Sequence, residues 1–488
     1  MTIRTGAQYK AGLKNYREVW IEGQKIDDVT THYAFTEPIA SIASLYDKQH
    51  QPELSEILTY SSPDTNNKTS TFFLTPVTHD HLLKRRMAIK TYADATFGLM
   101  GRSPDFLNTA VMAFAAAKDF FGQVNSDFAD NILTYYNYCQ ENDVFLSCAL
   151  VNPQVDRSKA SGEQKDPYAH LRVVQETADG LLVRGAKMIS TLAPLADELF
   201  VFPLPGLKPG DEPYALAFSI PINTPGLRLI CRESFSRTNQ SLFDHPLSSR
   251  FEEIDAACVF DDVLIPWERV FFYGNVELAN VLYAQTNARN YTSHQGAVRA
   301  LAKAELLVGI AIALAEMAKT NSFLHVQEML GELLGYLELV KGAVLLSERE
   351  AQKTPWGTLC PAIEPLVALR YHFPRMNARM VEVIQTLGAG GLISCPMEQD
   401  FNTPIGADIE RYFRGTEVSA QERLHLLKLA WDVTGDAFGQ RQLLYERYHA
   451  GDPVRIAAGQ YREYDKLSLL KRVESALKNS CGSANARN

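Results

Sequence analysis

The sequence lacks the short motifs that mark several common classes of enzyme. No G-x-G-x-x-G follows a predicted strand and no G-x-x-x-x-G-K-[ST] occurs, so neither a dinucleotide-binding sheet nor a P-loop is expected. H-E-x-x-H is absent and the 11 histidines do not cluster along the chain, so a metal site has no support. The absence of G-x-S-x-G argues against an esterase. Any nucleotide cofactor must therefore be held outside these familiar loops.

Cysteine is scarce, and its spacing shows no pairs. The seven cysteines are odd in number and include no C-x-x-C, which disfavours a disulfide framework and a zinc knuckle. Free thiols in a reducing cytoplasm are the expected state. A nucleophilic pair such as Cys148 with His294 stays open, because sequence distance does not report proximity in the fold.

Excess positive charge and long apolar runs are also missing. The net charge of −9 disfavours nucleic acid and anionic membranes as partners. Met1–Gly6 has no apolar core of a signal peptide. The longest apolar stretch, Leu306–Met317, contains Glu316 and is too short to cross a bilayer. A cytoplasmic protein with no nucleic-acid partner and no membrane partner is therefore expected.

Hydrophobic periodicity divides the 488 residues into three parts, 1–143, 144–275 and 276–488. Apolar residues at helical spacing predict helices over 104–121, 297–320, 324–351, 374–387 and 420–448. Short β-rich runs bounded by turn residues predict strands over 171–174, 180–185, 199–202, 215–220, 227–231 and 256–260, the last ending in an Asp261-Asp262 turn. Lys478–Asn488 is predicted to be a frayed polar tail. This order predicts an α+β protein with an N-terminal helical domain, a middle β-barrel domain and a C-terminal helical bundle.

The segment Gly101–Asn108 is the first candidate for ligand binding. Ser103 followed by Pro104 is typical of the start of a helix, which places Arg102 beside a helix N-terminus. A planar cation and a helix N-terminus both favour anionic or electron-rich oxygen ligands. The alternative is a solvated surface arginine.

Three other segments have structural and functional interpretations that both stay open. Gln154 lies in a polar turn around Pro153 and could contact the edge of a heterocycle. Thr191 ends a predicted strand, either as a β-former or as a hydrogen-bonding group facing a ring nitrogen. His294 lies near the start of a helix, either as a structural residue or as a proton acceptor at neutral pH.

Taken together and in order, these segments resemble the 4-hydroxyphenylacetate 3-hydroxylase family, the large oxygenase components of two-component aromatic monooxygenases. The matching pieces span nearly the whole chain: 101–108, 151–157, 185–194, 263–271, 294–295, 387–392, 408–412, 430–441 and 445–453.

The resemblance implies an acyl-CoA-dehydrogenase-like fold, a homotetramer, and a separate NAD(P)H:flavin reductase that supplies FAD in its reduced form, FADH2. Dioxygen would add to the reduced flavin to give a C4a-hydroperoxide, which would hydroxylate a phenolic aromatic substrate. The protein would position the reactants and shield them from water.

The resemblance also implies roles for single residues. Arg102 corresponds to a pocket arginine and His294 to a proposed base, so both are expected to be catalytic. The expected substrate contacts are Arg102, Phe106, Cys148, Pro203 and Leu204. The expected flavin contacts are Gln154, Val155, Asp156, Arg157, Thr191, Arg441, Ala450, Gly451, Asp452 and Pro453.

Two positions depart from the family pattern. Phe106 and Cys148 stand where hydroxyphenylacetate hydroxylases carry a tyrosine and a histidine that contact the substrate phenol. Because an unpaired buried polar group costs about 1–3 kcal/mol, a pocket without these partners should prefer a phenol other than 4-hydroxyphenylacetate.

Two other classes of function stay open: an acyl-CoA-type dehydrogenase or dehydratase on the same fold, and a catalytically inactive binding relative. An iron–sulfur dehydratase of this superfamily needs three cysteines and a histidine. Leu301 stands seven residues after His294, and the first cysteine after Arg102 is Cys139, so the required thiolates are missing.

Overall fold

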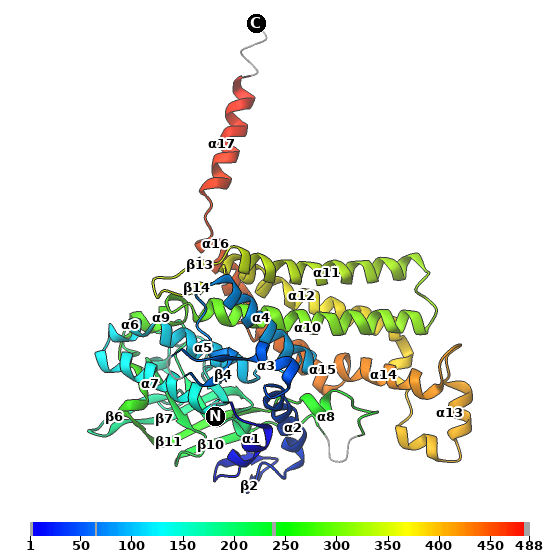
Figure 1. The fold of residues 1–488 in the computed structure, drawn as a ribbon, viewed down its shortest axis with the longest axis horizontal. Helices are drawn as coiled ribbons and strands as arrows, with labels where there is room; N and C mark the ends of the chain where they lie inside the picture. The colour runs from blue at the N-terminus through cyan, green and yellow to red at the C-terminus, as the bar shows by residue number, and fades with distance from the viewer. Residues whose placement is uncertain (1–2, 64–65, 237–240, 483–488) are drawn as a thin grey trace.

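The computed structural model of the chain describes residues 3–63, 66–236 and 241–482. Helices surround two β-sheets on one side and form a long bundle on the other (Figure 1). The N-terminal helices are α1 (Gly6–Gly12), α2 (Tyr33–Lys48), α3 (Pro52–Leu58), α4 (His79–Ala95), α5 (Pro104–Ala116), α6 (Lys118–Gly122) and α7 (Ser126–Asn142).

Helix α5 is the N-terminal element that positions the site. Pro104 occupies its first turn, as the sequence predicted, because proline has no N–H to leave unpaired there. The predicted helix 104–121 is interrupted at Ala117, where α5 ends and α6 begins. Nearly every side of α5 is buried, since it packs between α10 and strand β5.

The middle region contains two sheets. The larger has the strand order β2-β1-β10-β11-β7-β6 and the smaller β12-β9-β8-β5. The strands of these sheets are β1 (Glu18–Ile21), β2 (Gln24–Ile26), β5 (Leu146–Ala149), β6 (Arg172–Glu176), β7 (Gly180–Thr191), β8 (Glu198–Val201), β9 (Leu216–Pro221), β10 (Leu227–Cys231), β11 (Asp255–Pro266) and β12 (Val270–Tyr273). Two short hairpins lie outside them: β3 (Thr59–Ser61) with β4 (Lys68–Ser70), and β13 (Gln352–Lys353) with β14 (Leu359–Cys360).

The predicted β-barrel is wrong in one respect, because the two sheets share no strand among the described residues and do not close. Strand β1 comes from the predicted helical part of the chain and pairs in parallel with β10. Alternation of side chains predicts strands but not their partners, so closure could not be inferred from it.

The predicted Asp261-Asp262 turn is also wrong. Strand β11 continues through both residues and pairs with β7 on either side of a register shift. Asp262 takes a left-handed conformation (φ 51°) at this bulge and forms an ion pair with Arg184 of β7. The extra residue bends the strand without ending it.

The C-terminal bundle is built on α10 (Ala288–Met317), α11 (Leu324–Arg349) and α12 (Ile363–Gly388), which pack against one another. The other α-helices are α8 (Ser248–Phe251), α9 (Val276–Gln285), α13 (Gly406–Tyr412), α14 (Ala420–Thr434), α15 (Ala437–Tyr448), α16 (Pro453–Glu463) and α17 (Leu467–Gly482). The predicted helix 420–448 divides at Gly435, and the helix predicted to begin at Pro374 begins at Ile363. The last helix reaches Gly482, so the predicted tail is helical to that point and its remainder lies outside the described residues.

One stretch, 363–402, is long and apolar enough to cross a membrane by length and composition. Its helix α12 packs along α10 and α11, as core helices of water-soluble proteins also do. The six cysteines whose side chains the structure describes are free, as predicted.

Candidate active site

Arg102 lies in the loop that leads into α5. Its N–H donates to Glu253 Oε1 (2.8 Å), and its Nη1 donates to the Gly101 carbonyl (3.1 Å) and the Tyr445 hydroxyl (2.6 Å). The guanidinium lies over the Phe106 ring, 4.1 Å from the centroid. No carboxylate in the described part of the chain forms a salt bridge with it. Its positive charge therefore faces aromatic and hydroxyl groups and can act on a ligand.

Gly101 permits this arrangement. A Cβ atom at this position would lie 2.0 Å from the Tyr445 hydroxyl oxygen, which no side chain could tolerate. The glycine thus lets α15 approach the start of α5 closely enough for Tyr445 to bind Arg102.

One face of α15 carries Arg441, Tyr445 and His449 at four-residue spacing. Arg441 donates to both oxygens of Asp255 (2.8 Å each), and Thr191 donates to the same carboxylate (2.7 Å). Burial opposes ionisation of Asp255, but its arginine partners hold the pKa at about 2. This carboxylate therefore fixes the end of β7, the start of β11 and α15 together.

Tyr445 and His449 stack with ring centroids 4.7 Å apart. Burial lowers the pKa of His449 to about 3, so its imidazole is neutral at ordinary pH. Burial raises the pKa of Tyr445 to about 12, so its hydroxyl stays protonated. Tyr445 accepts one hydrogen bond from Arg102 and keeps its own O–H proton available for a ligand oxygen.

Two of the predicted substrate contacts, Phe106 and Cys148, lie at Arg102. Cys148, in β5, has a thiol pKa that burial raises and that Arg102 lowers through its charge and a hydrogen bond. Phe202, directly before Pro203 and Leu204, stacks on Tyr283 of α9 with ring centroids 5.5 Å apart. The structure thus brings Arg102, Phe106 and Cys148 together, with the 203–204 segment joined through Tyr283.

The predicted flavin segments lie at two places. Val151 bridges to Met188, so the turn that contains Gln154–Arg157 runs beside the end of β7, where Thr191 lies. Gln154 donates to the Asn152 carbonyl (3.0 Å). The 450–453 segment follows α15: Gly451 has φ 108°, and Asp452 caps α16, whose first residue is Pro453.

The chemistry of the first place fits a flavin. Val155, Met188 and Ile189 are exposed apolar residues that a flat ring could cover. Lys187 beside them is buried and donates to Asn152 Oδ1 (2.7 Å) and the Leu150 carbonyl (3.2 Å), with no acidic partner among the described residues. Burial lowers its pKa to about 8. Because successive strand residues point to opposite faces, Lys187 lies behind the exposed Met188 and can add positive charge only from beneath a ring that covers this surface.

The contact described for His294 is with a carboxylate of α11. Its Nε2 lies 2.8 Å from Glu348 Oε1 of α11, and Glu348 also pairs with Arg86 of α4. Its catalytic role stays a prediction that these contacts do not support.

Sequence reasoning did not select Tyr283, Arg370, Tyr445, His449 or Lys187. The four-residue spacing of Arg441, Tyr445 and His449 could have revealed the α15 face. Lys187 gives no local signal, because its distinguishing feature, burial without an acidic partner among the described residues, appears only in the folded protein.

The chain is an α+β protein in which helices flank a two-sheet middle region and a cationic, aromatic-lined cluster lies where α5 meets α15. Residues 5–272 match the family described as 4-hydroxyphenylacetate 3-hydroxylase N terminal, and residues 279–478 its C-terminal counterpart. The chain belongs to this 4-hydroxyphenylacetate 3-hydroxylase family.

Comparison with individual proteins supports the same family assignment. A 4-hydroxyphenylacetate 3-monooxygenase oxygenase component from Thermus thermophilus is 44% identical over 98% of each chain. A crystal structure of such an oxygenase component complexed with FAD matches with a TM-score of 0.94, 44% identity, and coverage of 98% of this chain and 99% of the other. An archaeal 4-hydroxybutyryl-CoA dehydratase from N. maritimus shares only the fold, at 21% identity and a TM-score of 0.88 over 98% of this chain and 95% of the other.

Proposed function

We propose that this chain is the oxygenase component of a two-component monooxygenase, which hydroxylates a phenol with dioxygen and FADH2 supplied by a separate flavin reductase. The observation that carries the proposal is the full-length family match joined to Arg102, whose guanidinium forms no salt bridge among the described residues, although Glu253 lies near it. We place the protein in the cytoplasm.

Reduced flavin, when bound, supplies the activation of dioxygen and the transfer of one oxygen atom to the ring. The chain's own residues would hold and orient the reactants. Arg102 stabilises the negative charge of a phenolate oxygen, and the protonated Tyr445 hydroxyl donates a second hydrogen bond to it. Burial of this cluster excludes water and strengthens both interactions.

The residues proposed to hold the flavin are those of 154–157 and 450–453 with Thr191 and Arg441. Thr191 and Arg441 share Asp255, so a loss of either would disturb both ends of the cofactor site. Lys187 supplies positive charge from the interior of the sheet.

The substrate proposed is a phenol other than 4-hydroxyphenylacetate. Phe106 gives an apolar ring beneath Arg102, and the Cys148 thiol is a weak donor whose ionisation burial disfavours. A site with these two residues has fewer strong hydrogen-bonding groups for a phenol oxygen than one with tyrosine and histidine.

The decisive test is anaerobic mixing of the protein with FADH2 and then addition of oxygen with a panel of phenols. We expect protein-bound reduced flavin, and hydroxylated product from at least one phenol. The proposal is refuted if the protein neither binds reduced FAD nor slows the oxidation of FADH2 that gives no hydroxylated product. Highest activity on 4-hydroxyphenylacetate itself would overturn only the substrate argument. In that case, the double substitution Phe106→Tyr with Cys148→His should not lower the activity on 4-hydroxyphenylacetate.

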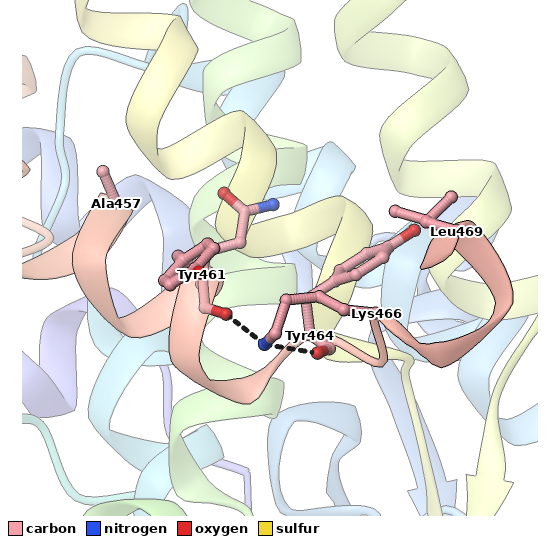
Figure 2. Close-up of a pocket in the computed structure, with 6 residues that line it drawn as sticks. Ala457, Tyr461, Tyr464, Lys466 and Leu469 are labelled. Carbon is pink, nitrogen blue, oxygen red and sulfur yellow. Dashed lines mark hydrogen bonds between the residues drawn. The ribbon is translucent and has the colours of Figure 1, made fainter. Parts of the chain in front are cut away.

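We also propose a homotetramer. Helix α17 extends away from the body of the molecule (Figure 1) and exposes a stripe of apolar side chains: Leu467, Leu470, Val473 and Leu477. Figure 2 shows the groove at its base, of about 400 Å³, where Tyr461, Tyr464 and Leu469 lie around Lys466. An amphipathic helix projecting from a protein is most simply covered by another copy of the same chain.

A further inference from the structure

Arg370 of α12 is a largely buried guanidinium with too few partners. It donates to Ser293 Oγ (3.3 Å) and to the Ala450 carbonyl. No carboxylate within the described ranges forms a salt bridge with it, whereas Arg299 binds Glu446 and Arg441 binds Asp255. Because a guanidinium has five N–H donors, most of those of Arg370 have no protein acceptor in the part of the chain that the structure describes. Part of its side chain remains accessible to solvent.

The charge around Arg370 is also unbalanced. Burial lowers its pKa, and the positive charge of Arg289 on α10 lowers it further. Arg289 pairs instead with Glu463 of α16 (3.1 Å), whose side chain is 57% exposed. Arg370 alone of the two has no carboxylate partner among the described residues, and an anionic ligand would offset the cost of burying its charge.

Arg370 faces the same site as Arg102. Burial raises the pKa of the Tyr283 hydroxyl, and the charges of Arg370 and Arg102 both counteract the rise, so both guanidinium groups lie near Tyr283. Tyr283 also stacks on Phe202, next to the predicted substrate segment. A second connection runs through α15: Arg370 donates to the Ala450 carbonyl, and Ala450 follows His449. His449 stacks on Tyr445, the hydrogen-bond partner of Arg102.

We propose that Arg370 is a specificity-determining residue that binds the anionic end of an aromatic substrate while Arg102 binds the phenol oxygen. The inference rests on the proposed function. An arginine with free, coplanar N–H groups suits a carboxylate, which accepts two of them at once. The diphosphate of FAD offers oxygens of the same chemistry, so the test must separate the two sources.

The test measures binding rather than turnover. Arg370→Met removes the charge and keeps much of the volume, and Arg375→Met is the matched control because Arg375 is an exposed arginine of the same helix. Dissociation constants are measured by equilibrium dialysis, without oxygen, for 3-(4-hydroxyphenyl)propanoate and its neutral alcohol, 3-(4-hydroxyphenyl)propanol. The same variants are titrated with FAD and with riboflavin, which has no phosphate.

We expect Arg370→Met to weaken the carboxylate ligand about 10- to 100-fold and the neutral alcohol less than about 2-fold, as for a hydrogen-bonded charge. Arg370→Lys should restore part of the difference, and Arg375→Met should change neither constant. An equal loss of affinity for both phenols would mean that Arg370 only anchors the 450–453 segment. A loss of affinity for FAD but not for riboflavin would mean that Arg370 binds the cofactor. Either result overturns the proposal. Suppose that the wild-type protein hydroxylates the neutral phenol and Arg370→Met does not weaken the carboxylate ligand selectively. That result refutes this inference alone. If the wild-type protein gives no product from any phenol, the proposed function is refuted.

Discussion

At the scale of single residues, the Arg102–Tyr445 hydrogen bond is the contact on which the site depends. Tyr445→Phe keeps the ring but removes the hydroxyl that accepts from Arg102. Because a hydrogen bond to a charged group contributes about 1.5–3 kcal/mol, we expect hydroxylated product per FADH2 consumed to fall about 10-fold or more. Product analysis with peroxide measurement checks this. Tyr448→Phe, at an exposed tyrosine of the same helix, should leave the ratio unchanged.

Asp105 directly precedes Phe106 in the first turn of α5, and its burial predicts that stability depends on pH. It accepts from Ser103 (2.6 Å) and Gln295 (2.8 Å), and burial raises its pKa from 3.8 to about 6. Between pH 4 and 6 the folded protein holds a proton that the unfolded chain has released. The contribution of Asp105 to the free energy of unfolding therefore falls as pH rises through this window, by up to about 3 kcal/mol.

Asp105→Asn removes this titration while keeping the shape of the side chain. Its stability relative to the wild type should rise from pH 4 to pH 6 and then level off, as measured from denaturation midpoints at a series of pH values. A difference that does not change with pH would show that the carboxyl is already ionised throughout the window.

The sequence could identify Arg102 but not its partners. The Ser103-Pro104 helix start lies directly beside it and gives a local signal. Tyr445 is 343 residues away along the chain, and only the folded α15 brings it to Gly101. For His294 the residue type suggested chemistry, but sequence could not show that its ring would contact Glu348 of α11, and its catalytic role stays a prediction.

At the scale of elements, α15 is held to the bundle by a buried ionic network. Glu446 accepts from Arg299 (2.7 and 2.8 Å) and from Lys303 (2.7 Å) of α10. Glu446→Gln leaves two buried cations without a counter-charge, so we expect a loss of about 3–5 kcal/mol in the free energy of unfolding, read as a lower Tm. Glu463→Gln breaks an exposed pair with Arg289 and should cost less than about 1 kcal/mol. Equal effects of the two substitutions would contradict a special role for the buried network.

Long periodic helices were the elements most predictable from sequence. The helix predicted over 324–351 is α11, Leu324–Arg349, and the strand predicted over 227–231 is β10. Errors arose where a local signal was overruled by packing: Pro374 lies inside α12 instead of starting it, and Asp261-Asp262 form a bulge that the partner strand β7 keeps in register. Hydrogen bonds to residues distant in sequence decide such cases.

At the scale of the whole molecule, the order of helical, β-rich and helical regions was predictable, but the pairing of distant strands was not. The hairpin β1–β2 crosses from the N-terminal part into the larger sheet by pairing with β10, more than 200 residues away in sequence. Composition identifies the regions, and only tertiary contacts decide which surfaces they share.

Assembly is the last property that the chain's surface predicts. At 100° per residue, Leu467, Leu470, Val473 and Leu477 fall on one side of α17, whereas Ser468 and Ser475 fall on the other. If this apolar stripe contacts a second copy, Leu470→Asp with Val473→Asp should bury charge at the contact and divide the assembly. Light scattering after size exclusion should then give a mass below four times the 54.5 kDa chain. Ser468→Asp with Ser475→Asp introduces the same residues on the opposite side and should leave the tetramer intact; a tetramer that survives both double substitutions would place the contact elsewhere on the molecule.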